Sequence, residues 1–250
     1  SHPDNPDYLA NLGGARQALG DVGGALPCFE RALMIDPIHA DARWNRGIAR
    51  LLTGDLAHGF ADYEARWMLP EFTERRFRAA RWTGGDIVGR TLLLHSEQGF
   101  GDTIQMIRFA SVLKKRGARV YLETHAPLKR LMETAVGLDG VYVRGEPLPG
   151  LDLHLPIMSL PRACGLASLA DVPGEVPYLA VRNDASASIA HGNDRALRVG
   201  LAWAGRPTHR HDRDRSCSLA AFAPLAGIAG VQLYSLQVSD RAADLAAVPW

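Results

Sequence analysis

The sequence predicts an α/β protein in which helical hairpins precede a parallel α/β domain and the beginning of a second α/β unit. Three observations predict this fold class: residues repeat at a fixed spacing up to position 66, short apolar runs alternate with helical patterns from residue 88, and a polar, small-residue segment then precedes another such run. We expect helical repeats over 1–66, a connector over 67–87, an α/β domain over 88–182, a linker over 183–195 and a partial α/β domain over 196–250.

The internal repeat is the first element to justify. Five pairs of related residues are 34 positions apart, namely Gly13 and Gly47, Gly20 and Gly54, Asp21 and Asp55, Phe29 and Tyr63, and Glu30 and Glu64. This spacing is the period of the tetratricopeptide repeat (TPR), a pair of antiparallel helices. The small residues would let the two helices approach closely, the aromatic residue would fill the gap between them, and Pro37 would end the second helix.

The second repeat departs from the pattern at three positions. Arg46 stands where a leucine is expected, and Gly59 and Arg66 stand where alanines are expected. Because about three repeats are usually needed for an independent solenoid, we expect a truncated array or a hairpin that docks onto the next domain. A hairpin that only packs and a module that binds a partner are both compatible with this pattern.

The connector over 67–87 is rich in aromatic residues, among them Phe72, Phe77 and Trp82. Flexible linkers are rich in glycine and serine instead. We therefore expect the connector to fasten the helices to the following domain.

Overall composition restricts the class of protein. A net charge of +1 argues against broad, non-specific nucleic-acid binding. Cys28, Cys164 and Cys217 form no C-x-x-C pair, which fits a reducing compartment such as the cytoplasm. No apolar run approaches the ~20 residues that span a bilayer, and no signal peptide is visible. From the opening Ser1-His2-Pro3 we expect the chain to be a fragment of a longer protein.

From residue 88 onward, apolar runs predict strands at 91–96, 119–124, 140–144 and 152–156, with helices at 103–116 and 127–135. After the linker we expect strands at 197–203 and 231–237 and a helix at 219–226. Strands that alternate with helices indicate a parallel sheet with right-handed crossovers, a Rossmann-like arrangement.

A glycine-rich turn, Glu97-Gln98-Gly99-Phe100-Gly101-Asp102, joins the first of these strands to its helix. The carboxyl ends of parallel strands form the ligand crevice of an open sheet, and glycine lets a ligand approach the backbone. We expect Asp102 at the N-cap of the helix, where it could serve as a helix cap only or as a general base.

A dinucleotide site is a competing interpretation of the same turn. Gly99-Phe100-Gly101 begins a G-x-G-x-x-G pattern, and Glu123 follows ~20 residues later. Ile104 occupies the third glycine position, however, and Asp102 would bring a negative charge to the place where a pyrophosphate binds.

Residues 95–141, with a strand, the G-x-G-D turn, a helix, an R-G-A-R-V strand and a second helix, resemble the N-terminal domain of heptosyltransferase-type glycosyltransferases (family 9). These are inverting, metal-independent enzymes of the GT-B fold. The order TPR, D-Y-E-A-R-W, G-R-T-L-L-L-H-S-E-Q-G-F-G-D and V-P-Y-L looks like that of bacterial TPR proteins fused to such a domain.

The resemblance implies roles for the residues of the turn. Asp102 would deprotonate the acceptor hydroxyl, and Glu97, Gln98, Gly99 and Gly101 would form the acceptor side of the site. Glu97 and Gln98 stand where heptosyltransferases carry small hydroxyl residues, which leaves the acceptor undefined. The co-substrate would be a nucleotide sugar, and no metal or other cofactor is implied.

A basic loop over 204–216 follows the first strand of the second α/β unit. The resemblance implies that His209, Arg213, Arg215 and Ser216 approach the diphosphate of the donor, for which arginine forks are suited. Two alternatives are a metal site built from His209, His211 and Asp212, and a solvated loop with internal arginine–aspartate pairs.

The resemblance implies an inverting glycosyltransferase that moves a sugar from a nucleotide sugar to a glycan or protein acceptor, and we expect the TPR segment to dock a partner or the acceptor. Because a complete donor domain would extend beyond residue 250, we expect the chain itself to bind acceptor and to lack turnover. The alternative is a TPR interaction scaffold that carries a degenerate or truncated transferase domain.

Overall fold

The computed structural model describes residues 4–181, 196–205, 207 and 212–250. The chain divides into two compact units, Ser1–Asn183 and Asp184–Trp250. Within the described residues, no helix is both long enough and apolar enough to cross a membrane.

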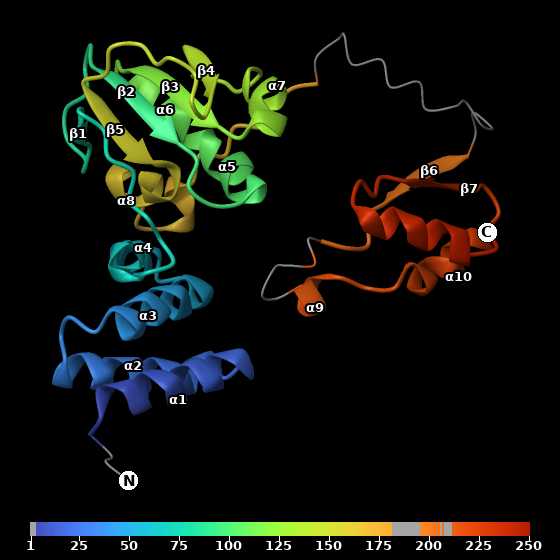
Figure 1. Ribbon diagram of the computed structural model, residues 1–250, viewed down its shortest axis with the longest axis horizontal. Coiled ribbons are helices and arrows are strands. Elements are labelled where there is room, and N and C mark those ends of the chain that lie inside the picture. Colours follow the sequence, from blue (N-terminus) through green and yellow to red (C-terminus); the bar gives the residue numbers. More distant parts are fainter. Residues whose placement is uncertain (1–3, 182–195, 206, 208–211) are drawn as a thin grey trace. The chain divides into compact units, whose positions relative to one another are not determined.

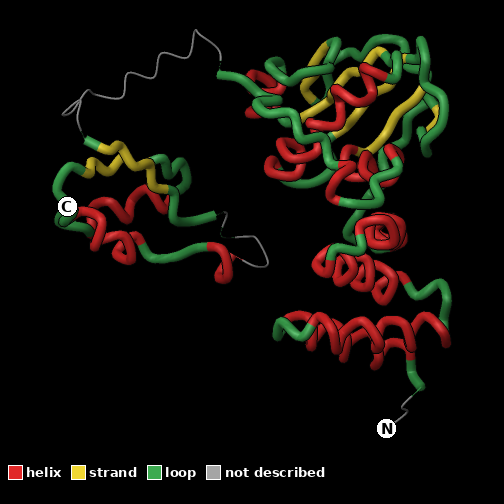
Figure 2. The backbone as a smooth tube through the Cα atoms, turned by 180° about the vertical axis from the view of Figure 1, so that it is seen from behind, coloured by secondary structure: helices red, strands yellow, loops and turns green. Residues whose placement is uncertain are grey.

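The first unit begins with two helical hairpins, which stack between the N-terminus and the sheet (Figures 1 and 2). They consist of α1 (Pro6–Ala18) with α2 (Val22–Ile35), and α3 (Ala40–Thr53) with α4 (Leu56–Tyr63), followed by the 3₁₀ helix η1 (Glu64–Met68). Gly20 and Gly54 both adopt the left-handed backbone conformation, with φ of 84° and 87°. The predicted repeat is therefore confirmed in three dimensions.

The repeated small and aromatic residues pack as the sequence predicts. A Cβ atom at Gly13 would lie 2.5 Å from Cε1 of Phe29, which is fully buried. At the equivalent place in the second hairpin, a Cβ atom at Gly47 would lie 2.9 Å from the backbone nitrogen of Tyr63. Each glycine therefore sets how closely its two helices approach.

The sheet of the first unit has five parallel strands in the order β1-β5-β2-β3-β4. The strands are β1 (Ala80–Arg81), β2 (Thr91–His95), β3 (Arg119–Thr124), β4 (Gly140–Val143) and β5 (Leu153–Pro156). This order confirms the predicted Rossmann-like parallel sheet. Strand β1, which was not predicted, comes from the connector and forms one edge of the sheet.

Short helices link the strands: α5 (Phe100–Met106), η2 (Ile107–Phe109) and α6 (Ala110–Lys115), then η3 (Ala126–Leu128) and α7 (Lys129–Met132), and finally η4 (Ile157–Ser159), α8 (Leu160–Cys164) and η5 (Leu169–Asp171). The helix predicted at 103–116 begins three residues earlier and is interrupted by η2. The helix predicted at 127–135 is shorter, and α8 was not predicted.

One hydrophobic core joins the sheet to the helices that follow it and to the second hairpin. Leu92, Leu94 and Leu122 are fully buried in this core. Leu56 and Tyr63 of the second hairpin belong to the same core. The second hairpin is therefore docked onto the sheet and shares its interior.

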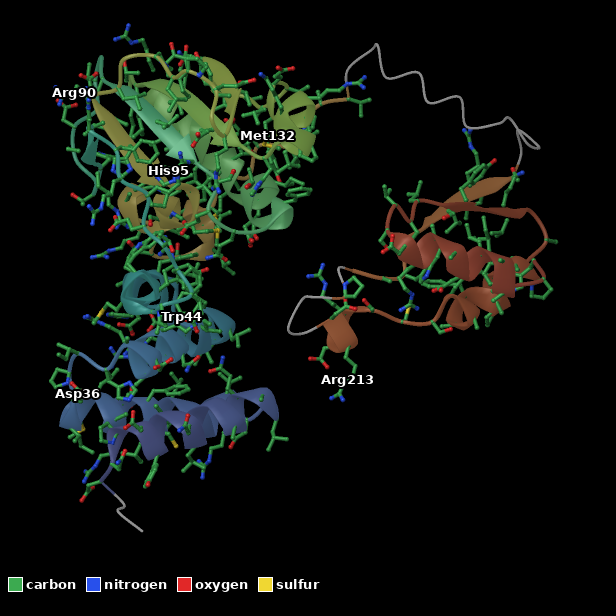
Figure 3. The ribbon with its side chains drawn as sticks, viewed as in Figure 1. Asp36, Trp44, Arg90, His95, Met132 and Arg213 are labelled. Carbon is green, nitrogen blue, oxygen red and sulfur yellow. The ribbon has the colours of Figure 1, made fainter. Side chains whose placement is uncertain are left out.

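The connector covers the opposite face of the sheet. Side chains alternate along a strand, so His95 on β2, labelled in Figure 3, lies on the face opposite Leu94. Nε2 of His95 lies 3.2 Å from Nδ1 of His154 on β5. The ring of Phe77 lies 4.9 Å from that of His95 and 4.6 Å from that of His154. Phe72 contacts Trp44 of α3 at 5.2 Å between ring centroids, which confirms that aromatic residues fasten the connector.

The second unit is a small βα arrangement. Its strands β6 (Leu197–Leu201) and β7 (Val231–Ser235) are parallel, and its helices are α9 (Asp212–Arg215), η6 (Leu219–Phe222), α10 (Ala223–Ala226) and η7 (Asp240–Ala247). Leu201, Trp203 and Leu219 form its buried core.

Candidate functional site

The glycine-rich turn lies at the carboxyl end of β2, a strand that has neighbours on both sides in the sheet. Gly99 is the N-cap of α5, so Asp102 is the third residue of the helix. The expectation that Asp102 itself is the N-cap was wrong, because the helix begins at Phe100. Asp102 still caps the helix, since its Oδ2 accepts a hydrogen bond of 2.8 Å from the backbone N–H of Gly99.

The carboxylate of Asp102 is partly exposed, and only one of its two oxygens accepts a hydrogen bond from a described residue. Among the described residues, no donor contacts its second oxygen, Oδ1. An exposed carboxylate oxygen at the ligand edge of a parallel sheet can accept a hydrogen bond or a proton from a bound hydroxyl group.

Two glycines beside Asp102 are exposed. A Cβ atom at Gly101 would meet nothing within 4 Å, and one at Gly99 would approach only the side chain of Asp102. The packing of the described chain therefore does not require glycine at 101. The absence of a side chain there leaves the start of α5 accessible to a ligand.

Hydrogen bonds between three hydroxyl groups hold the turn to the strands. Thr103 donates to Ser96 at 2.9 Å, and Ser96 donates to Thr124 at the end of β3 at 3.1 Å. All three side chains are buried. This chain of hydrogen bonds ties the first turn of α5 to two strands, so the position of Asp102 is fixed by the sheet.

The side chain of Gln98 reaches the second hairpin. Its amide donates to the hydroxyl of Tyr63 at 2.9 Å. The backbone carbonyl of Gln98 lies 3.1 Å from Nε2 of His125, and the ring of His125 lies 5.2 Å from that of Phe100. Phe100 is 47% exposed, so it presents an aromatic surface next to Asp102.

Glu97 is held inside the protein by Arg66. Two parallel hydrogen bonds of 3.0 and 2.9 Å join the guanidinium to the carboxylate, and the N–H of Met158 donates to the same carboxylate at 3.0 Å. The side chain of Glu97 is 8% exposed and that of Arg66 is fully buried. Burial raises the pKa of Glu97, which Arg66 opposes. The structure therefore presents Gly99, Gly101 and Asp102 at the surface of the turn, while Glu97 binds the hairpin.

Sequence reasoning missed the role of Arg66. It treated this residue as a loss of the repeat pattern, but Arg66 also donates to Glu64 and to Ser159, both at 2.8 Å. The available signal was a permanently charged side chain at a position where the repeat buries an alanine, which requires a buried partner.

The structure argues against a dinucleotide site, because the acidic residue that would bind the ribose, Glu123, is not accessible. Glu123 is buried beneath the connector, where both its oxygens pair with Arg75. Its carboxylate is therefore not available to a ribose at the edge of the sheet.

The basic loop belongs to the second unit. Arg213 and Arg215 are exposed on α9, and Figure 3 labels Arg213 there. The hydroxyl of Ser216 accepts from the N–H of Gly205 at 2.9 Å and donates to Asp212 at 2.8 Å, so it closes the loop internally. His209 lies outside the described residues. Within the described part of the chain, no group of three or more His, Cys, Asp or Glu side chains is arranged to hold a metal ion.

Comparison with known proteins gives distant relatives. No family model matches the chain. A segment is 28% identical over 152 residues to the protein FlbA of Caulobacter vibrioides, covering 45% of this chain and 25% of FlbA. A mutant O-GlcNAc transferase of Thermobaculum terrenum aligns with a TM-score of 0.26 and 16% identity, over 56% of this chain and 35% of that protein. The fold assignment rests on the strand order given above.

Proposed function

We propose that this chain is the acceptor-binding part of an inverting GT-B glycosyltransferase, in which Asp102 is the general base. The observation that carries this proposal is the state of the Asp102 carboxylate: one oxygen is held by Gly99, and the other has no partner among the described residues. The carboxylate lies at the ligand edge of a parallel sheet, next to Gly101, a position where the packing does not require glycine.

The chemistry fits a single carboxylate. An alcohol is a weak nucleophile, and a base within hydrogen-bond reach removes its proton as the oxygen attacks. In an inverting transfer, the acceptor oxygen forms a bond to the sugar carbon while the bond to the nucleotide diphosphate breaks on the opposite side. One base is enough because no covalent enzyme intermediate forms.

The donor would be a nucleotide sugar, with Arg213 and Arg215 on the diphosphate. Both arginines are exposed on α9, and guanidinium groups form charge-assisted hydrogen bonds to phosphate oxygens. If they do so, replacing either by alanine weakens nucleotide-sugar binding in calorimetry, whereas an unchanged affinity favours a solvated loop.

The test of the base uses two variants of Asp102. Asp102→Asn retains an oxygen that can accept the Gly99 N–H, so we expect little change in stability and a loss of transfer of ~10²–10⁴-fold. Asp102→Ala loses the transfer and about 1 kcal/mol of cap stability as well. Thermal melts and a transfer assay with nucleotide-sugar donors measure both effects. A fully active Asn variant would show that Asp102 is only a cap.

An interaction module is the second candidate. Tyr8, Leu12 and Met34 on the first hairpin are 59%, 47% and 75% exposed, which is apolar surface that a partner could cover. If a partner covers this surface, replacing Tyr8 and Leu12 by serine abolishes the complex with that partner in sedimentation experiments. Any transfer activity of the chain stays unchanged. Unchanged sedimentation of the double variant would remove the support for this candidate.

A further inference from the structure

A second polar site lies where the connector passes between the hairpins and the sheet. It is a cavity of about 300 Å³, lined by Glu64, Trp67, Arg81, Thr83, Ser159 and Arg162 among others. These residues come from η1, from β1 and the residues after it, and from η4 and α8. None of them belongs to the glycine-rich turn, so this cavity is distinct from the proposed acceptor site.

The cavity has hydrogen-bond donors without acceptors. The guanidinium of Arg162 and the hydroxyl of Thr83 have no partner among the described residues, and both residues are exposed. The indole nitrogen of Trp67 is buried and also has no acceptor. The two exposed side chains are donors that a ligand in the cavity can reach, whereas the indole nitrogen is not accessible from it.

The acceptors that do line the cavity are already in use. The carboxylate of Glu64 accepts from Arg66 and Ser159, each at 2.8 Å, and from Arg81 at 2.5 Å. These contacts lower the pKa of Glu64 although burial opposes them, so it remains charged and occupied. A ligand would therefore have to bring acceptors of its own.

The balance of charge favours an anionic ligand. Arg66 is paired with Glu64 and Glu97, and Arg81 with Glu64, whereas Arg162 at the rim of the cavity has no counter-charge among the described residues. The guanidinium of Arg162 can hold a carboxylate or phosphate oxygen, and the Thr83 hydroxyl can add a second hydrogen bond.

We propose that this cavity binds a small oxyanion-bearing ligand, such as a sugar acid or a phosphorylated sugar, through Arg162 and Thr83. The volume is at the lower end of those seen for small-molecule sites and admits one such unit. Ser159 and Glu64 contact both the cavity and Arg66, so the ligand binds at the junction that holds the hairpin to the sheet. A ligand bound only by the folded chain also raises its melting temperature.

Calorimetric titration of the chain with glucuronate, inorganic phosphate and neutral glucose tests this site. We expect one of the two anions to bind and glucose not to bind. Preference for glucuronate identifies a sugar carboxylate, and preference for phosphate identifies a phosphate group. Arg162→Ala should weaken binding by about tenfold or more, because a charge-assisted contact is lost.

Matched variants distinguish binding in this cavity from binding elsewhere on the chain. Arg90 is an exposed arginine outside the cavity, so Arg90→Ala should bind the anion like the original chain. Asp102→Asn should bind it equally well, so this test and that of the proposed base fail independently. The inference is overturned if neither anion binds at millimolar concentration, if glucose binds as well as glucuronate, or if Arg162→Ala and Arg90→Ala have the same affinity.

Discussion

Replacing Arg66 by methionine tests whether its ion pairs hold the second hairpin to the sheet. Methionine fills much of the same volume but leaves Glu97, which is 8% exposed, without its guanidinium partner. Removing one partner of a buried ion pair costs about 3–5 kcal/mol. For a chain of this size, each kcal/mol changes the melting temperature by roughly 2–4 °C, so we expect the melting temperature to fall by roughly 6–20 °C.

The loss of stability caused by Arg66→Met should depend on pH. In the variant, burial of Glu97 is no longer opposed by Arg66, so its pKa rises further above its ordinary value of 4.5. As the pH rises above that value, the unfolded chain loses a proton that the folded variant retains, and the variant becomes less stable. The difference from the original chain should therefore be smaller near pH 5 than near pH 8, as measured by urea unfolding.

The double variant Arg66→Met with Glu97→Gln is the control. A neutral glutamine is less costly to bury than an unpaired carboxylate, so the second substitution should recover part of the loss. A single Arg66→Met variant that unfolds at the original temperature at pH 8 would refute the reasoning that this pair is an essential link. So would a double variant that is no more stable than the single one.

Three further predictions concern other parts of the first unit. Arg46→Leu restores the leucine of the repeat but should lower stability by about 1–3 kcal/mol in urea unfolding, because Asp62, bound by Arg46 at 2.7 Å, loses a partner; a more stable variant would contradict this. Burial, together with His154, lowers the pKa of His95 from 6.5 to about 2, so the stability of the chain should fall as the pH drops below 6.5. His95→Leu should flatten that profile in urea unfolding, and an unchanged profile would contradict this. Gly101→Ala should leave the melting temperature unchanged or raise it slightly while weakening acceptor binding, and unaltered acceptor affinity would count against a ligand at the start of α5.

Periodicity made the fold predictable from the sequence. The 34-residue spacing places Gly13 against Phe29 and Gly47 against the backbone of Tyr63, and the same glycine and aromatic residues were the signal in the sequence. The apolar run at 91–95 became a strand that is buried along its whole length. Edge strand β1 could not be predicted in this way, because two residues are too few to show a period.

The candidate site was predictable in position but not in its contacts. The turn after β2 places Asp102 at the ligand edge of any parallel sheet, and the sequence is sufficient for that conclusion. The start of α5 was misplaced by three residues, because boundaries depend on hydrogen bonds that composition does not determine. The partners of Glu97 and Gln98 are Arg66 and Tyr63, which lie 31 and 35 residues earlier in the chain, and no local pattern connects them.

Two of the three departures of the second repeat fit contacts within the hairpin, and the third, Arg66, binds the hairpin to the sheet. Arg46 binds Asp62 of α4, and a Cβ atom at Gly59 would lie 2.8 Å from Leu51, so glycine allows a closer approach of α3 and α4 than alanine would. Arg66 occupies the place of a repeat alanine and is fully buried against Glu97. Random loss of a repeat would leave unpaired charges and cavities, since buried charges without partners are strongly unfavourable. Here Arg46 and Arg66 each have a charged partner and Gly59 lies against Leu51. Arg66 bonds to Glu97, at the start of the turn that carries Asp102. The helical repeat is therefore part of the framework that positions this turn.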